Sequence, residues 1–341
     1  MSTADLVAGL LWLALTAYAV LAGADFGGGV WDLLARGPRS PEQRQAVASA
    51  MGPVWEANHV WLIFMITGLF TAFPIAFATL GVAVYLPLTL ALVGIVLRGA
   101  AFVFRAHGRE TLGPVTGWGA VFGAASLMAP FFLGTVAAAV ATGSLRVGKA
   151  ASASSMFTGW TTPSAILIGL FAVSLCAYLA ATYLMVETED RPALQADFRG
   201  RAILAALISG VLALLALFVV ALQSPRLLES LTGRGLPLLV LAIVNGPVAL
   251  WAVWQSRPRI ARVAVIAQVV LVLWTWVVGQ WPYLIPPDLT IAAAAAPPET
   301  LSAMLGVVAV GMALLLPSLW LLFRVFKSKN PAVTTVGPVE R

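Results

Sequence analysis

Charged residues are scarce in this chain of 341 residues. Asp, Glu, Lys and Arg make up only 10% of it, whereas apolar residues make up 60%; a soluble domain carries about 25% charged residues. So few charges cannot cover a water-facing surface of this size, and the mean hydropathy of +0.95 indicates the same. The composition excludes an ordinary soluble protein and favours one bundle of membrane helices.

Cysteine and histidine are nearly absent as well. Cys176 is the only cysteine, which excludes an internal disulfide and a cysteine-based metal site. The two histidines are His59 and His107, and only His59 falls in a position that we expect to be buried. Haem iron takes axial His, Met or Cys ligands. We therefore predict no metal and no haem or other cofactor in this chain.

Nine stretches are long and apolar enough to cross a membrane, since a span needs about 20 predominantly apolar residues. We expect each to be a helix, because backbone polar groups in lipid must be satisfied within the segment. The stretches are 6–34, 47–72, 77–104, 115–141, 161–185, 202–223, 236–254, 261–284 and 301–325. The predicted fold is all-α, with one polytopic transmembrane domain at residues 1–326 and a short tail at 327–341. The first stretch is expected to be a retained helix and not a signal peptide.

The basic residues predict an orientation. The net charge of +6 does not indicate nucleic-acid binding, because the arginines form short clusters between the apolar stretches. Of the 20 Lys and Arg residues, 16 fall on one side of the predicted membrane and 4 on the other. Positive charge stays in the cytoplasm. We therefore expect the N-terminus outside and the C-terminus in the cytoplasm.

Three ionisable residues stand inside the predicted spans, where such residues are costly and usually functional. They are Asp25, Glu56 and Arg98. An α-helix rises about 1.5 Å per residue, so the number of residues to the nearest loop arginine predicts the depth of each group. Both acids should lie roughly 15 Å from the cytoplasmic surface, and Arg98 roughly 10 Å from it. Burial disfavours a charged carboxylate and a nearby cation favours it. Such a balance lets a carboxyl group take up and release protons.

Simpler interpretations of these residues stay open. The acids and Arg98 can form a structural ion pair that only joins helices, and Arg98 alone can extend to the membrane surface. His59, three residues after Glu56, is open to three interpretations: ligand, proton carrier or hydrogen-bonded packing residue. Gly23 and Gly27 form a small-xxx-small pair that predicts close approach of another helix.

Three motifs resemble subunit II of cytochrome bd-type quinol oxidases. They run from Gly23 to Asp32 (GADFGGGVWD), from Met51 to Leu62 (MGPVWEANHVWL) and from Leu97 to Arg105 (LRGAAFVFR). The resemblance implies nine helices in the bacterial cytoplasmic (inner) membrane. It also implies a partner, subunit I, which carries haems b558, b595 and d. The resemblance does not decide whether small accessory membrane subunits are present or whether a quinone binds this chain.

The same resemblance implies a function for the complex, which oxidises ubiquinol or menaquinol and reduces oxygen to water with protons from the cytoplasm. The acid of the first helix and the acid of the W-[DE]-x-N motif are associated with the proton path in this family. They correspond to Asp25 and Glu56, with Trp55, Asn58 and Arg98 around them. Some members have Asp and Gln where this sequence has Glu56 and His59, so local hydrogen bonds can differ.

Two functions other than that of an oxidase subunit stay open. A secondary transporter would use Asp25, Glu56 and Arg98 as an ion or substrate site. Transporters usually show paired halves with breaks in corresponding positions, and the sequence shows Pro53 without a matching break in a second half. The third function is a purely structural assembly subunit in which no residue titrates.

Overall fold

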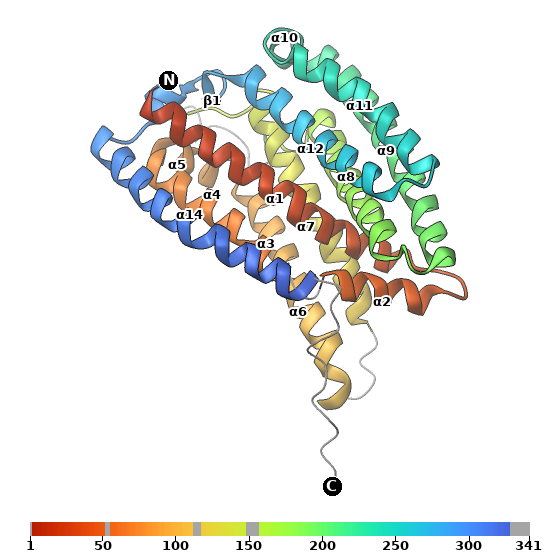
Figure 1. Ribbon diagram of the computed structural model, residues 1–341. Helices are drawn as coiled ribbons and strands as arrows, with labels where there is room; N and C mark the ends of the chain where they lie inside the picture. Colours follow the sequence, from red (N-terminus) through yellow and green to blue (C-terminus); the bar gives the residue numbers. More distant parts are fainter. Residues whose placement is uncertain (1, 52–54, 112–116, 148–156, 328–341) are drawn as a thin grey trace.

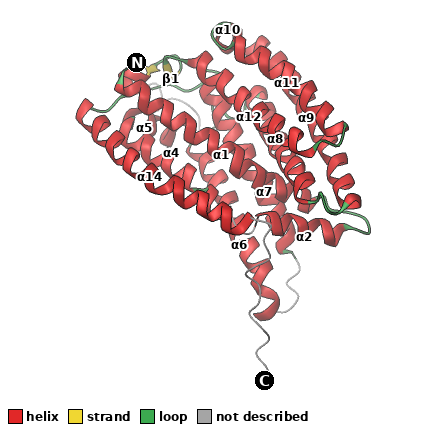
Figure 2. Cartoon of the chain, in the orientation of Figure 1, coloured by secondary structure: helices red, strands yellow, loops and turns green. Residues whose placement is uncertain are grey.

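The computed structural model describes residues 2–51, 55–111, 117–147 and 157–327. Helices dominate these residues, and Figure 2 shows strand only at one small hairpin. The helices are α1 (Thr3–Leu33), α2 (Ser40–Met51), α3 (Trp55–Asn58), α4 (Val60–Ala72), α5 (Pro74–Ala83), α6 (Tyr85–Thr111), α7 (Trp118–Ala141), α8 (Pro163–Glu187), α9 (Pro192–Gln223), α10 (Pro225–Thr232), α11 (Leu236–Trp254), α12 (Pro258–Gln280), α13 (Ile291–Ala294) and α14 (Pro298–Lys327). The strands are β1 (Tyr283–Ile285) and β2 (Leu289–Thr290), which pair antiparallel.

Eight helices of the described residues are long and apolar enough to cross a membrane. They are α1, α6, α7, α8, α9, α11, α12 and α14. The prediction of an all-helical membrane protein is confirmed, whereas the ninth span is not. A further candidate is a broken pair, Glu56–Ala72 with Pro74–Ala83, which bends by 116°. Residues 328–341 of the predicted tail lie outside the described residues.

Two predicted spans are wrong in their bounds. Stretch 47–72 is divided among α2, α3 and α4, and stretch 77–104 begins in α5 and continues in α6. α4 has 13 residues, which is about 20 Å of helix and too short for a hydrocarbon core of about 30 Å. Pro74 stands directly after the junction residue Phe73, whose φ of −136° and ψ of 61° are not helical. Proline disfavours helical geometry in the residue before it, and this accounts for the bend.

α1 is the central helix of the bundle. It packs against α8 and α7 along most of its length, and also against α4, α12 and α14. In Figure 1, α14, α4 and α5 lie on one side of α1, and α12, α9 and α11 lie on the other. α1 is therefore in contact with both halves of the molecule.

Three successive glycines let three other helices approach α1. A Cβ added at Gly27 would lie 1.8 Å from the carbonyl oxygen of Cys176 in α8. At Gly28 it would lie 2.5 Å from Met51 Sδ in α2, and at Gly29 2.0 Å from Ser126 Oγ in α7. Successive helix positions point about 100° apart, so each glycine faces a different neighbour. The predicted packing role of Gly27 is confirmed.

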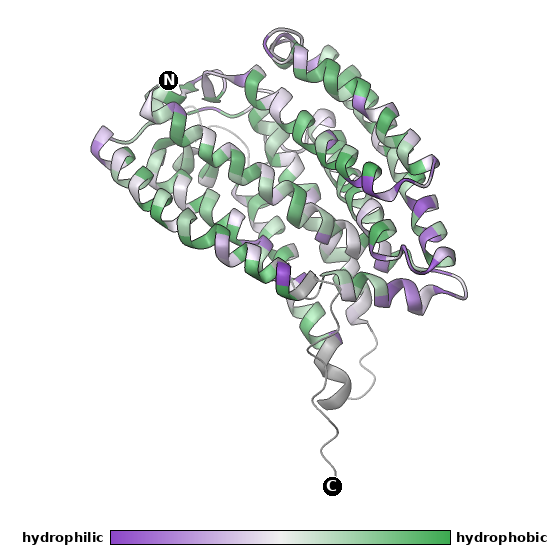
Figure 3. Cartoon of the chain, in the orientation of Figure 1, coloured by the Kyte–Doolittle hydropathy of each residue, from purple (hydrophilic) through white to green (hydrophobic). Residues whose placement is uncertain are grey.

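The charged loops gather at two opposite ends. At one end, which we call the arginine-rich end, Arg39 pairs with Asp197, Arg259 with Glu189 (3.2 Å) and Arg105 with Asp32 (2.7 Å). The hydrogen bond to Asp197 raises the pKa of the Arg39 guanidinium. At the other end, Arg146 pairs with Asp288 (3.4 Å) beside the hairpin. Figure 3 shows hydrophilic residues concentrated where α2 and the start of α9 meet. The predicted cytoplasmic loops thus share one end, while their orientation in a membrane stays a prediction.

Candidate functional site

Asp25 lies in the interior of the bundle, on a helix that has neighbours on several sides. Only 6% of the residue is exposed. The Nδ2 group of Asn58, at the end of α3, donates a hydrogen bond to Asp25 Oδ2 and lies 3.5 Å from the carbonyl oxygen of Leu21. Asn58 is itself 3% exposed. A buried carboxyl group is therefore held by an amide donor from the second motif of the sequence.

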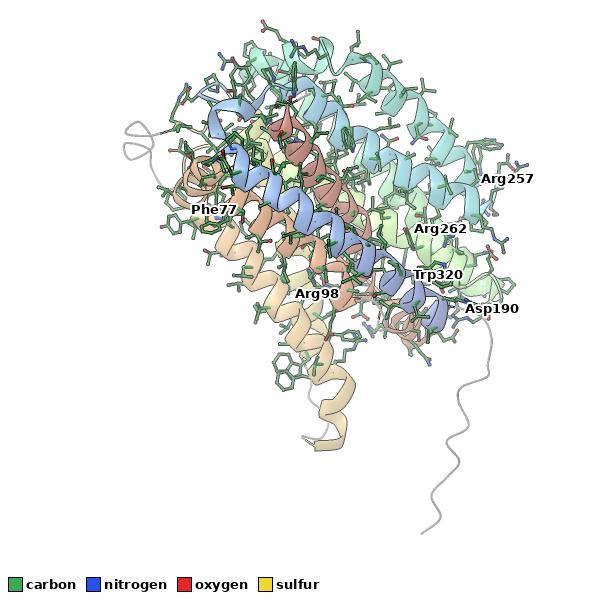
Figure 4. All side chains as sticks on the ribbon, turned by 60° about the vertical axis from the view of Figure 1, so that its left-hand side comes forward. Phe77, Arg98, Asp190, Arg257, Arg262 and Trp320 are labelled. Carbon is green, nitrogen blue, oxygen red and sulfur yellow. The ribbon has the colours of Figure 1, made fainter. Side chains whose placement is uncertain are left out.

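Arg98 of α6 is buried as well, at 2% exposure. Its guanidinium carbon lies 5.2 Å from the ring centre of Phe26 and 5.4 Å from that of Phe122, which are favourable cation–π distances. Its charge interacts with that of Asp25. Within the described part of the chain, Nε and Nη2 have no hydrogen-bond partner. Extension of Arg98 to the membrane surface is thus excluded, and Figure 4 shows it well away from Arg257 and Arg262.

Two aromatic groups complete the cluster. His59, between α3 and α4, is half-buried, and its ring centre lies 5.9 Å from that of Tyr18 and 6.2 Å from that of Phe26. Tyr18 is 4% exposed and interacts electrostatically with Arg98 and Asp25. Tyr18 was not among the site residues predicted from the sequence. Its spacing of seven residues from Asp25, which is two helical turns, is the signal that predicts a shared face.

Glu56 does not join this buried cluster. Its side chain is exposed, and among the described residues the structure gives its carboxylate no hydrogen bond or ion pair. The equal depth of Glu56 and Asp25 in a membrane stays a prediction, because the exposed fraction of a side chain does not measure its distance from the membrane surface. Because residues two apart face different sides of a helix, Asn58 faces Asp25 and Glu56 faces outward.

The remaining predicted residue, Trp55, begins α3. Its side chain lies outside the described part of the structure. Of the six predicted site residues, the structure therefore brings together Asp25, Asn58, Arg98 and His59.

A cavity of about 70 Å³ adjoins Asp25 between α1, α2 and α8. Asp25, Gly28, Met51, Asn58, Tyr183 and Glu187 are among its lining residues. Since a water molecule occupies about 30 Å³ in the liquid, the cavity has room for about two. It extends from the buried carboxyl group toward the arginine-rich end.

This arrangement suits proton exchange or a structural ion pair. A carboxyl group that accepts a hydrogen bond from an amide, interacts with the charge of a guanidinium and borders a cavity large enough for water can change its protonation state inside the bundle. Among the described residues, no three His, Cys, Asp or Glu side chains lie close enough together to hold a metal ion.

Comparisons with known proteins cover nearly the whole chain. Residues 3–326 match the family described as Cytochrome bd terminal oxidase subunit II. The "Putative cytochrome bd menaquinol oxidase subunit II" of Bacillus subtilis (strain 168) is 23% identical over an alignment of 340 residues that covers 95% of this chain and 96% of that protein. The cytochrome bd-I ubiquinol oxidase subunit 2 of Escherichia coli (strain K12) is 27% identical over an alignment of 188 residues that covers 52% of this chain and 47% of that protein.

A solved structure shows the same fold. The bd oxidase from Geobacillus thermodenitrificans contains a chain that superposes with a TM-score of 0.71 at 22% identity. The superposition covers 96% of this chain and 99% of the other.

Proposed function

The chain belongs to the family of cytochrome bd terminal oxidase subunit II, and we propose that it supports a haem-bearing subunit I and carries protons to it. It is a subunit of a haem-containing quinol oxidase, an oxidoreductase complex. The transporter alternative has no further support once the family is known. In this proposal, haems b558, b595 and d belong to subunit I, because the chain offers only His59 and His107 as histidine ligands. The complex oxidises a quinol and reduces oxygen to water.

The proposed proton role rests on one observation: Asp25 is buried and has two partners. Asn58 donates a hydrogen bond to the carboxylate and Arg98 supplies a buried positive charge. Both favour the charged carboxylate, whereas burial favours the neutral acid. The cavity next to Asp25 has room for the water that a proton transfer needs. Asp25 is therefore the proposed proton-carrying residue inside this subunit.

Glu56 has a different part in the proposal. An exposed carboxylate beside the apolar helix α4 is costly if lipid covers it. The exposed face of α4, which follows Glu56 in the chain, carries apolar side chains such as Ile63, which is 60% exposed. We propose that subunit I covers this face and that Glu56 passes protons from Asp25 across the interface. Asn58, two residues after Glu56 in the chain, fixes the position of Asp25 through its hydrogen bond.

The experiment compares Asp25→Asn with Asp25→Glu in the purified complex. Asn keeps the size and the hydrogen bonding but removes the titrating group, so oxygen consumption should fall by about 100-fold, at the low end of proton-transfer effects. Haem content should stay normal, and Asp25→Glu should retain much of the activity. Full activity of Asp25→Asn at full haem content would refute the proton role. Loss of haem in Asp25→Asn together with normal assembly of Asp25→Glu would favour the purely structural ion pair.

A further inference from the structure

The cavity beside Asp25 reaches a second acid, which none of the sequence motifs contains. Glu187 is the last residue of α8 and lines the same cavity as Asp25. Its side chain is exposed, so it meets solvent at the arginine-rich end of the bundle. One cavity is thus lined both by a buried carboxyl group and by an exposed one.

The helix geometry explains why both acids face one cavity. Ala180, Tyr183 and Glu187 of α8 all line it, and their spacings of three and four residues place them on one face of the helix. Gly27 of α1 touches Cys176, which fixes the register of the two helices. Glu187 follows Cys176 by 11 residues, or about 16 Å of helix. Glu187 therefore lies well beyond Asp25 in the direction of the arginine-rich end.

Tyr183 lies between the two acids. It is half-buried, lines the cavity and interacts electrostatically with Asp25. The guanidinium carbon of Arg262 lies 5.6 Å from the centre of its ring. A tyrosine hydroxyl both donates and accepts hydrogen bonds, so it can join a chain of water molecules between two carboxyl groups.

We propose that Glu187 collects protons from bulk water and delivers them to Asp25 through cavity water and the Tyr183 hydroxyl. This inference rests on the proposed proton role of Asp25. A proton from bulk water binds the Glu187 carboxylate, the carboxyl group releases a proton into the cavity, and the Asp25 carboxylate takes one up. Glu187 is then ionised again, and no charge accumulates along the route.

The chain offers a matched control for Glu187. Glu189 stands two residues further on, also at the arginine-rich end, and is paired with Arg259. It does not line the cavity. An exposed ion pair of this kind contributes about 1 kcal/mol or less to stability. Glu189→Gln therefore removes the same charge from the same region without touching the proposed route.

The test measures oxygen consumption and haem content of the whole complex with Glu187→Gln, Glu187→Asp, Glu189→Gln and Asp25→Asn. Glu187→Gln should lower turnover about tenfold at normal haem content. This effect is smaller than that expected for Asp25→Asn, because protons from bulk water can still enter the cavity without Glu187. Glu187→Asp should restore most of the turnover, and Glu189→Gln should match the wild type. A slow Asp25→Asn with a normal Glu187→Gln overturns this inference alone. If Asp25→Asn is also normal, the proposed function itself fails.

A second pair of variants decides the case if Glu187→Gln loses haem. Ala50 of α2 lines the cavity and is half-buried, whereas Ala48 is exposed and does not line it. Ala50→Leu should fill the water space and slow turnover at normal haem content, and Ala48→Leu should not. Wild-type turnover of Ala50→Leu would overturn the route.

Discussion

The contact between α1 and α8 depends on the absence of a side chain at Gly27. In Gly27→Ala, the new Cβ would lie 1.8 Å from the carbonyl oxygen of Cys176 and 2.8 Å from the nitrogen of Ala177. Real Cβ atoms essentially never approach within 3.0 Å, so the helices would have to separate locally by roughly 1 Å. Overpacking costs about 1–3 kcal/mol. Because a backbone cannot rotate away as a side chain can, we expect about 3 kcal/mol, the upper end of that range.

Gly9 of the same helix is the control, because a Cβ there has nothing within 4 Å. Gly9→Ala should be neutral or slightly stabilising, by about 0.5–1 kcal/mol from helix propensity. The assay is thermal unfolding of the purified complex, with the yield of assembled complex as a second measure. Gly27→Ala should melt well below the wild type and assemble poorly. A melting temperature equal to that of Gly9→Ala would refute the close packing of α1 on α8.

Three further predictions follow from the site, the loops and the composition. Glu56→Gln should slow oxygen reduction at normal haem content, and Glu56→Asp should be milder; full activity of Glu56→Gln would remove Glu56 from the proton route. Thiol labelling of intact cells should modify Thr232→Cys and not Ser256→Cys, since both positions are exposed at opposite ends; the reverse result would invert the predicted orientation. The chain expressed without subunit I should be colourless, and a stoichiometric Soret band in the purified chain would make His59 the first candidate ligand.

The sequence predicted best the helices that are continuous apolar runs with clear ends. α8 is an example, predicted as 161–185 and observed as Pro163–Glu187. Its start is marked by Thr162, whose side chain accepts a hydrogen bond from the nitrogen of Ala165, and by Pro163. Threonine at the cap and proline in the first turn are the signals expected at a helix start.

Hydropathy failed where an apolar run contains a break. The run from 77 to 104 is apolar enough to suggest one span, yet α5 ends at Ala83 and α6 begins at Tyr85, and Val84 between them has a φ of −126° and a ψ of 30° that are not helical. Hydropathy does not register such a change in the backbone.

Part of the site could be predicted from the sequence, because the residues concerned follow physical rules for charges in membranes. Counting residues from the loop arginines predicted Asp25 and Arg98 in the same half of the membrane, and charges inside spans need partners. The side chain that contacts Asp25, Asn58, was named only through the family motif. The 3.6-residue helix period separates Asn58 from Glu56 by roughly 200°. Once α1 with Asp25 is placed, this period therefore predicts that only one of these two side chains, Asn58 or Glu56, faces inward.

Proton uptake during a single turnover tests the central claim most directly. The fully reduced complex in sealed vesicles is mixed with oxygen, with a pH indicator on the side of the arginine-rich end. The wild type should take up protons from that side as oxygen is reduced. In Asp25→Asn the same uptake should be slowed by about 100-fold while haem content is unchanged. Uptake by Asp25→Asn at the wild-type rate would contradict the account.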